Sequence, residues 1–268
     1  MKQRLLILDL DGTLTNSQKK VTSATKAAIL DMMARGHKCM LASGRAPAGI
    51  RPIAEELKLQ KNGGYILAFN GAKIINYSTQ EVLYQQTVPH EYLPTLVKFA
   101  KEHHCGLITY TEDELISANG IDEYIQLESR ITDVPIHEVT NFSEYITFPI
   151  NKCLMTAYPD HAAKCEVLLR EIVGDKLNVY RSDPFFIEVV PKGVDKASSL
   201  EKLLPLIGIS REDCVACGDG FNDISMIKFA GVGVAMGNAQ QVVKDAADFI
   251  TLTNDEDGII PVIEKYFE

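Results

Sequence analysis

The chain opens with an apolar run that ends in acidic residues. Nearly every position from Leu5 to Leu10 is apolar, which predicts a strand buried on both faces. Asp9 and Asp11 stand at the end of this run, and side chains two residues apart point to the same face of an extended chain. We therefore expect two neighbouring carboxylates, whose repulsion a cation or a proton must offset.

Apolar runs alternate with helix-type segments in both terminal parts of the chain. The pattern predicts a helix from Thr22 or Ser23 to Arg35, a short strand, "KCMLASGR", that ends in Ser43-Gly44-Arg45, and a helix over 47–57. Asn70-Gly71 lies between two apolar runs and predicts a tight hairpin turn. Strands separated by single helices indicate parallel crossover units and hence a doubly wound sheet.

The middle of the chain has a different pattern. Helix-type segments such as "EYLPTLVKFAKEHH" and "DHAAKCEVLLREIVG" interleave with apolar strands that can pair in antiparallel fashion. We therefore predict an α/β fold. Residues 1–83 and 191–268 form a doubly wound parallel-sheet core of Rossmann-like type, and residues 84–190 form an inserted α+β domain.

Composition narrows the classes of protein. The chain has 268 residues and a net charge of −9, which argues against a nucleic-acid binder because phosphate backbones attract basic surfaces. It contains no apolar run of the roughly 18 to 20 residues that a membrane helix needs, and no signal-type segment. We expect a cytoplasmic protein with neither membrane nor nucleic-acid partners. The oligomeric state cannot be predicted from the sequence.

The six cysteines are scattered through apolar segments, which is typical of reduced thiols. Cys214 and Cys217 form a C-x-x-C motif, but a spacing of three puts them on opposite faces of a strand. We interpret them as small core residues rather than as a redox or zinc site. The histidines show no zinc-ligand pattern.

Polar residues follow three predicted strands and open one predicted helix. They are Asp9 and Asp11, Ser43 with Arg45, Asp219 with Asn222 and Asp223, and the lysines Lys192 and Lys196. Ligands of open α/β sheets bind at the carboxyl ends of the strands. If the strands are adjacent, Asp9, Asp11 and Asp219 converge, and three carboxylates in one cleft fit Mg²⁺. A hydroxyl, a mobile lysine and backbone N–H groups beside that ion predict a phosphoryl-transfer site.

These motifs resemble those of a known family. "DLDGT" from Asp9, "ASGR" with Ser43, Lys196, and "GDGFND" with Asp219 and Asp223 are similar, in this order, to the four motifs of the haloacid dehalogenase superfamily. The spacing is similar to that of its Cof-type (subfamily IIB) phosphatases, whose large cap lies between the second and third motifs. The resemblance covers essentially the whole chain.

The resemblance implies a role for each residue. Asp9 would be the nucleophile that forms an aspartyl phosphate, and Asp11 would transfer protons to the leaving alcohol and from water. The implied ligands of Mg²⁺ are Asp9, Asp11 through its backbone carbonyl, Asp219 and Asp223. For Asp223 the alternatives are a bond through water or the orientation of Lys196. The implied phosphate-binding residues are Ser43, Gly44, Arg45, Lys196 and Asn222, with Asn70 as a weaker candidate. Gly12 would let the backbone turn tightly under the phosphate.

The expected function is therefore a Mg²⁺-dependent phosphatase for small phosphomonoesters such as sugar phosphates, with the inserted domain closing over the site. Two alternatives stay open at this point. A phosphomutase would use the same aspartyl phosphate and depend on a bisphosphate activator. A non-catalytic phosphate-binding protein would have no need of the second aspartate.

Overall fold

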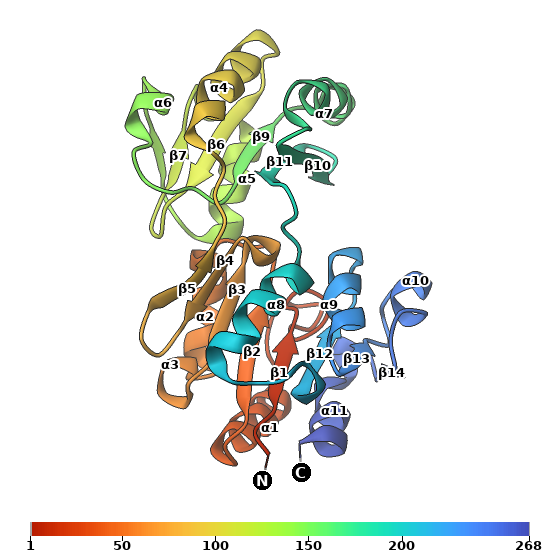
Figure 1. Cartoon of the computed structure of the whole chain (residues 1–268). Helices are drawn as coiled ribbons and strands as arrows, with labels where there is room; N and C mark the ends of the chain where they lie inside the picture. The colour runs from red at the N-terminus through yellow and green to blue at the C-terminus, as the bar shows by residue number, and fades with distance from the viewer. Residues whose placement is uncertain (1, 268) are drawn as a thin grey trace. The chain divides into compact units, whose positions relative to one another are not determined.

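The chain is described by a computed structural model that covers residues 2–267. It divides into two compact units (Figure 1). The first contains the residues up to Gly44, Ile50–Tyr84, and the residues from Asp195 onward. The second contains Arg45–Gly49 and Gln85–Val194.

An eight-stranded sheet forms the centre of the first unit, in the order β14-β13-β12-β1-β2-β3-β4-β5. The six strands from β14 to β3 are parallel, and β4 is antiparallel to β3. The strands are β1 (Leu5–Leu8), β2 (Lys38–Ala42), β3 (Tyr65–Ala68), β4 (Lys73–Asn76), β5 (Glu81–Gln85), β12 (Cys214–Gly218), β13 (Val232–Ala235) and β14 (Phe249–Ile250). The predicted α/β class with a parallel core sheet is confirmed.

Helices cover both faces of this sheet (Figure 1). They are α1 (Ser23–Ala34), α2 (Pro47–Glu56), α3 (Leu59–Asn62), α8 (Lys196–Ile207), α9 (Ile224–Phe229), α10 (Gln241–Lys244) and α11 (Ile259–Tyr266), with 3₁₀ turns η1 (Phe69–Gly71), η3 (Arg211–Asp213), η4 (Phe221–Asp223) and η5 (Asn254–Glu256). Leu5 and Ile7 of β1 share a core with Leu200 and Leu203 of α8. Successive strand residues point to opposite faces, so the odd-numbered residues of β1 face α8.

The connection between β3 and β4 is longer than the two-residue turn expected at Asn70-Gly71. Ala68 pairs with Lys73, and the 3₁₀ turn η1 lies between them. Phe69 and Asn70 both adopt left-handed φ angles, near 53° and 54°. The hairpin is present, but four residues connect its strands.

The second unit has its own six-stranded sheet, in the order β10-β11-β9-β6-β7-β8. All neighbouring pairs are antiparallel except β7 and β8. The strands are β6 (Gly106–Tyr110), β7 (Leu115–Ser117), β8 (Ile136–Glu138), β9 (Cys153–Thr156), β10 (Leu177–Asp183) and β11 (Phe186–Pro191). The helices are α4 (Leu93–Glu102), α5 (Glu123–Thr132), α6 (Phe142–Tyr145) and α7 (Pro159–Val173), with the 3₁₀ turn η2 (His90–Tyr92) before α4.

A buried polar cluster lies against one side of the second sheet. Lys152 forms an ion pair with Glu188 (Nζ–Oε2 3.0 Å), and its ammonium lies 4.7 Å from the ring centre of Tyr110. The Tyr110 hydroxyl donates a 2.8 Å hydrogen bond to Oε1 of Glu128 on α5. Burial raises the pKa of Glu128, an effect that Lys152 and the Tyr110 hydrogen bond oppose and that Glu188 reinforces.

We expect the free energy of unfolding of Glu128→Gln, relative to that of the wild type, to be higher at pH 8 than at pH 4. Folding raises the pKa of the Glu128 carboxyl above its value in the unfolded chain, near 4.5. Stability is therefore lost as the pH rises from this pKa through the higher pKa of the folded state. The amide has no such titration and keeps an oxygen that can accept the Tyr110 hydrogen bond. Urea unfolding of both proteins across this pH range measures the difference. The exposed Glu171→Gln on α7 is the control, and a Glu128→Gln effect that is independent of pH would contradict the prediction.

All six cysteines are buried and free of disulfides within residues 2–267. Cys214 and Cys217 both lie in β12, and burial raises the pKa of the Cys214 thiol to about 12, which fits an inert core residue. Within the same range, no helix combines the length and the apolar character needed to cross a membrane.

Candidate active site

The acidic residues lie where two neighbouring parallel strands end. β1 pairs with β12, and their carboxyl ends meet at the same edge of the sheet. Asp9 directly follows β1, and its N–H donates to the carbonyl of Cys217 at 3.0 Å. Asp219 directly follows β12. The pairing of the strands thus brings together two carboxylates that are 210 residues apart in sequence.

Lys196 connects this edge to α8. Asp9 continues the face of β1 that packs on α8, and Lys196 is the first residue of that helix. The ammonium donates to Asp9 Oδ1 at 2.7 Å, to Asp223 Oδ1 at 2.6 Å and to the carbonyl of Ala42 at 2.7 Å. The Lys196 side chain is fully buried, which is rare for lysine unless it is paired. It is therefore held as a fixed positive charge between two carboxylates.

Asp223 shapes the loop that carries Asp219. Its Oδ2 accepts hydrogen bonds from the N–H groups of Asp219 (3.0 Å) and Gly220 (2.9 Å), while its Oδ1 accepts from Lys196. Thr13 fixes the other side, because its hydroxyl donates to Asp219 Oδ1 at 2.9 Å. Both oxygens of Asp223 are thus engaged by the protein.

Asp9 and Asp219 carry raised pKa values. Burial, reinforced by Asp223 and opposed by Lys196, raises the pKa of Asp9 to about 8. Burial also raises the pKa of Asp219, although the Thr13 hydrogen bond lowers it. For Lys196, burial lowers the pKa, but the charges of Asp223 and Asp9 outweigh it and the net direction is upward. With all its carboxylates ionised, the site would therefore carry more negative charge than Lys196 balances, and a proton or a cation offsets the difference.

Gly12 is required by the close approach of the two loops. Its φ is 85°, in the left-handed region that favours glycine. A β-carbon at this position would stand 2.3 Å from Asp219 Oδ2. Any side chain here would have to displace the Asp219 carboxylate.

Asp11 is placed differently from the expectation that it would converge with Asp9 and Asp219. The strand ends at Leu8, and Asp11 lies beyond it in an isolated bridge with Thr15, so strand alternation does not set its direction. Its Oδ1 accepts a 2.8 Å hydrogen bond from the Lys19 ammonium, and the side chain is 37% exposed. Among residues 2–267, the acidic group whose ligand atoms lie within 4.8 Å of one another consists of Asp9, Asp219 and Asp223.

The predicted phosphate-binding residues of the first unit lie in neighbouring loops. Ser43 is buried at the end of β2, where its N–H donates to Leu67 O and its carbonyl accepts from Asn70 N–H. Asn222 is exposed and donates from Nδ2 to Asn70 Oδ1 at 3.0 Å. A β-carbon at Gly44 would approach Asn70 Nδ2 to 3.0 Å, so these loops are close together.

Arg45 belongs to the second unit, where its guanidinium donates to the carbonyl of Gly49 at 3.0 Å. Two contributors to the site were not predicted. Thr13 positions Asp219, and the Ala42 carbonyl accepts from Lys196. The threonine could have been noticed, since it stands inside the "DLDGT" motif.

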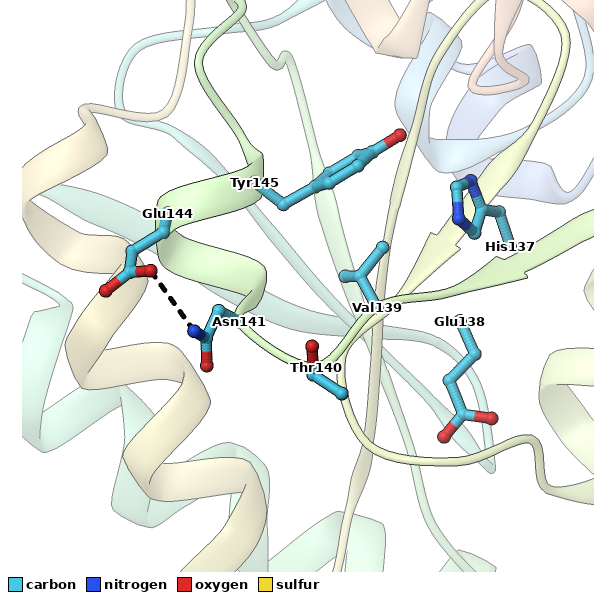
Figure 2. A pocket seen from close by; sticks show the side chains of 7 residues that line it. All are labelled: His137, Glu138, Val139, Thr140, Asn141, Glu144 and Tyr145. Atoms are coloured by element: carbon cyan, nitrogen blue, oxygen red, sulfur yellow. Dashed lines mark hydrogen bonds between the residues drawn. The ribbon is translucent and has the colours of Figure 1, made fainter.

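The second unit contains a separate hollow that shares no residue with this cluster. It measures about 450 Å³ (Figure 2) and is lined by His137, Glu138, Val139, Thr140, Asn141, Glu144 and Tyr145. Asn141 Nδ2 donates to Glu144 Oε2 at 3.1 Å between two of these lining residues (Figure 2). None of the predicted site residues lines this pocket.

Nearly the whole chain matches the model of one protein family. A family model described as haloacid dehalogenase-like hydrolase matches residues 6–263. The chain belongs to this family. The predicted superfamily and the predicted enzyme class, a hydrolase, are thereby confirmed.

Individual members of the haloacid dehalogenase-like family agree over nearly the full length. A crystal structure of such a hydrolase from Bacteroides thetaiotaomicron is 46% identical, with a TM-score of 0.95 over 99% of this chain and 100% of that one. A protein named as a HAD subclass IIB sugar phosphatase is 26% identical, with a TM-score of 0.79 over 98% and 99%. The 5-amino-6-(5-phospho-D-ribitylamino)uracil phosphatase YcsE of Bacillus subtilis is 30% identical over 98% of this chain and 95% of its own.

Proposed function

We propose that this chain is a Mg²⁺-dependent phosphatase that hydrolyses small phosphomonoesters through an aspartyl phosphate on Asp9. The observation that carries the proposal is the cluster of buried Asp9, half-buried Asp219 and buried Asp223 around Lys196, at the carboxyl ends of β1 and β12. Relatives in the haloacid dehalogenase-like family are named as phosphatases, which supports this class of reaction.

The donor set fits Mg²⁺. Carboxylate oxygens are hard ligands, and the ion is usually held in proteins by one or two carboxylates together with water and substrate phosphate. Asp9 and Asp219 are the candidates for direct ligands, together with the backbone carbonyl of Asp11. Asp223 uses both its oxygens for Lys196 and for the N–H groups of Asp219 and Gly220, so we assign it to positioning these groups. When bound, Mg²⁺ would neutralise charge on the phosphoryl group and favour the ionised form of Asp9.

In the first step, an Asp9 oxygen attacks phosphorus while the bond from phosphorus to the ester oxygen breaks. Lys196 holds Asp9 in position, because its ammonium donates a hydrogen bond to Asp9 Oδ1 at 2.7 Å. The departing alcohol oxygen takes a proton from Asp11, whose partly exposed position beyond the end of β1 gives it access to both substrate and water.

In the second step, water attacks the phosphorus of the aspartyl phosphate and gives a proton to Asp11. The bond from phosphorus to Asp9 breaks, which releases inorganic phosphate and restores the carboxylate. Ser43, Gly44, Asn222 and Lys196 are proposed to hold the phosphoryl oxygens through N–H, hydroxyl, amide and ammonium donors. Arg45 stays a prediction for this role.

Phosphorylated sugars and similar metabolites are the proposed substrate class, by analogy with the printed names of the sugar phosphatase and of YcsE. The test is release of inorganic phosphate from a panel of phosphorylated metabolites, with and without Mg²⁺. We expect turnover that chelation with EDTA abolishes and that Mg²⁺ restores. Turnover that persists in EDTA would refute the metal dependence.

Beryllium fluoride, which mimics a phosphoryl group on a carboxylate, separates the alternatives. An enzyme with an aspartyl phosphate should be inhibited by it in the presence of Mg²⁺. A chain that neither binds beryllium fluoride nor releases phosphate from any ester would be a binding protein instead. A requirement for a bisphosphate activator, with isomer rather than phosphate as product, would indicate a phosphomutase.

A further inference from the structure

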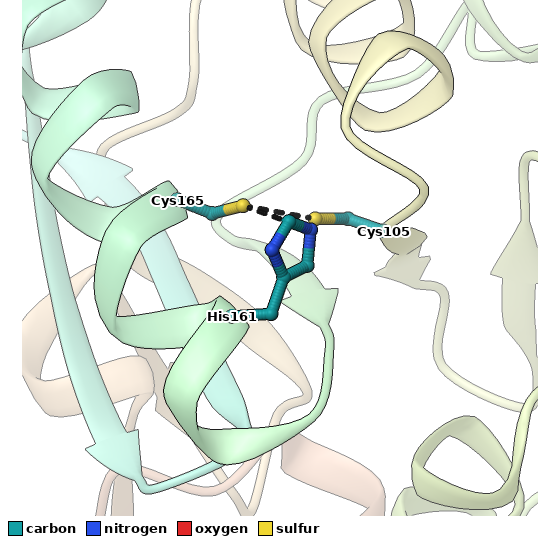
Figure 3. A group of neighbouring side chains, drawn as sticks. All are labelled: Cys105, His161 and Cys165. Carbon is teal, nitrogen blue, oxygen red and sulfur yellow. Dashed lines mark hydrogen bonds between the residues drawn. The ribbon is translucent and has the colours of Figure 1, made fainter.

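Two cysteines and a histidine meet in the second unit, and none of them belongs to the acidic cluster of the first unit. His161 and Cys165 lie four residues apart on α7, on the same face of the helix. Cys105 directly precedes β6 and is 60 residues away from Cys165 in sequence. Figure 3 shows both sulfur atoms and the imidazole ring turned toward one another.

The distances between these groups are those of ligands around one metal ion. The two Sγ atoms are 3.6 Å apart, and Cys165 Sγ lies 3.4 Å from His161 Nε2. Metal–sulfur and metal–nitrogen bonds of about 2.3 and 2.0 Å at tetrahedral angles give ligand separations of roughly 3.8 and 3.5 Å. All three ligand atoms lie within 4.8 Å of one another.

Packing in the apolar core accounts for the cysteines, whereas the histidine is partly exposed and bonds through Nε2 to the carbonyl of His103. Cys105 and Cys165 belong to the apolar core of the second unit, where free cysteine is common. An imidazole nitrogen beside both thiols adds a third donor of the type that Zn²⁺ prefers. His161 is only partly buried and lines a pocket of about 200 Å³ with His104 and Asp122. The pocket gives an ion access to His161, next to the two buried thiols.

We propose that Cys105, His161 and Cys165 bind a transition-metal ion of the Zn²⁺ class, with water as the fourth ligand. Two thiolates and one imidazole are the soft and borderline ligands that favour Zn²⁺ over Mg²⁺. The ion would connect α7 to the start of β6. This site is separate from the proposed phosphatase function and does not depend on it.

When the ion binds, the thiols of Cys105 and Cys165 each release one proton and become thiolates. Without the ion, His161 Nε2 lies 2.6 Å from the carbonyl of His103, which indicates an N–H donor at that nitrogen. The ion takes the place of the hydrogen on Nε2, and the ring carries its one proton on Nδ1. The hydrogen bond to His103 is exchanged for a metal–nitrogen bond, and the ring remains neutral.

The test is titration of the reduced, metal-free full chain with Co²⁺, followed by displacement with Zn²⁺. Cobalt bound to thiolates gives a sulfur-to-metal charge-transfer absorption that the carboxylates around Asp9 cannot produce. We expect one equivalent of this signal, its loss in Cys105→Ser and Cys165→Ser, and its retention in Cys153→Ser. Cys153 is a buried cysteine in β9 of the same unit and serves as the matched control.

His161→Ala keeps both thiols, so it tests the proposal even if the cysteine variants fail to fold. It should weaken Zn²⁺ binding by more than about 10-fold, since loss of even an outer-shell partner of a metal typically costs 10- to 100-fold. Wild-type protein should also melt at a higher temperature with Zn²⁺ than without, and this shift should shrink in His161→Ala. Absence of the charge-transfer signal would overturn the proposal. So would a reduced chain that forms a Cys105–Cys165 disulfide with hydrogen peroxide but binds no Co²⁺, since the pair would then be a redox site.

Discussion

Asp9→Asn is expected to lower the turnover of an aryl phosphate by roughly 10⁴-fold or more at saturating Mg²⁺, a loss typical of a removed nucleophile. The amide keeps the size of the aspartate and an oxygen that can accept the Lys196 hydrogen bond, but it cannot form the bond to phosphorus. Steady-state kinetics with an aryl phosphate measure the loss. Because the substitution is nearly isosteric, the effect should fall on kcat more than on KM.

Two controls separate loss of the nucleophile from loss of the fold. Asp31→Asn changes an aspartate of α1 that is 72% exposed and forms an ion pair with its helix neighbour Arg35, so activity should stay within a factor of two. Near-ultraviolet circular dichroism should show that Asp9→Asn retains its tertiary structure. A folded Asp9→Asn protein with undiminished turnover would rule out the aspartyl phosphate on this residue.

The parts of the site that follow from local pattern could be predicted. Asp9, Asp219 and Lys196 stand at the ends of long apolar runs or at a helix start, and parallel pairing of β1 with β12 is enough to bring the two acids together. The prediction for Asp11 relied on strand alternation beyond the point where the strand ends. Leu8 is the last residue of β1 to pair with β12, and the chain then turns, so Asp11 reaches Lys19 instead.

Features that depend on tertiary packing could not be predicted from the sequence. β7 and β8 have three residues each, and α6 has four, which is too short for a periodic pattern to be seen. Cys105 and His161 come together only because β6 and α7 pack in the same core. No spacing along the chain marks such a pair.

Lys196→Met is expected to impair both stability and activity. The ammonium is fully buried and donates to Asp9, Asp223 and the carbonyl of Ala42. Its removal leaves two buried carboxylates without their common positive partner, and breaking a buried pair in this way costs about 3–5 kcal/mol. Urea unfolding in EDTA measures this loss. Kinetics should show a fall in kcat/KM of roughly 10³-fold, since Asp9 loses its position and the phosphoryl group loses a cation.

Lys192→Met is the matched control, because this exposed lysine lies four residues before Lys196 and should tolerate the same change within about 0.5 kcal/mol. Adding Asp223→Asn to Lys196→Met should cost less than the sum of the two single changes, since the second carboxylate is already unpaired in the first variant. Mg²⁺ should recover part of the stability lost in Lys196→Met, because a cation near Asp9 and Asp219 replaces some of the missing positive charge. Strictly additive losses and no recovery with Mg²⁺ would show that Lys196 neither balances these carboxylates nor lies beside a cation site.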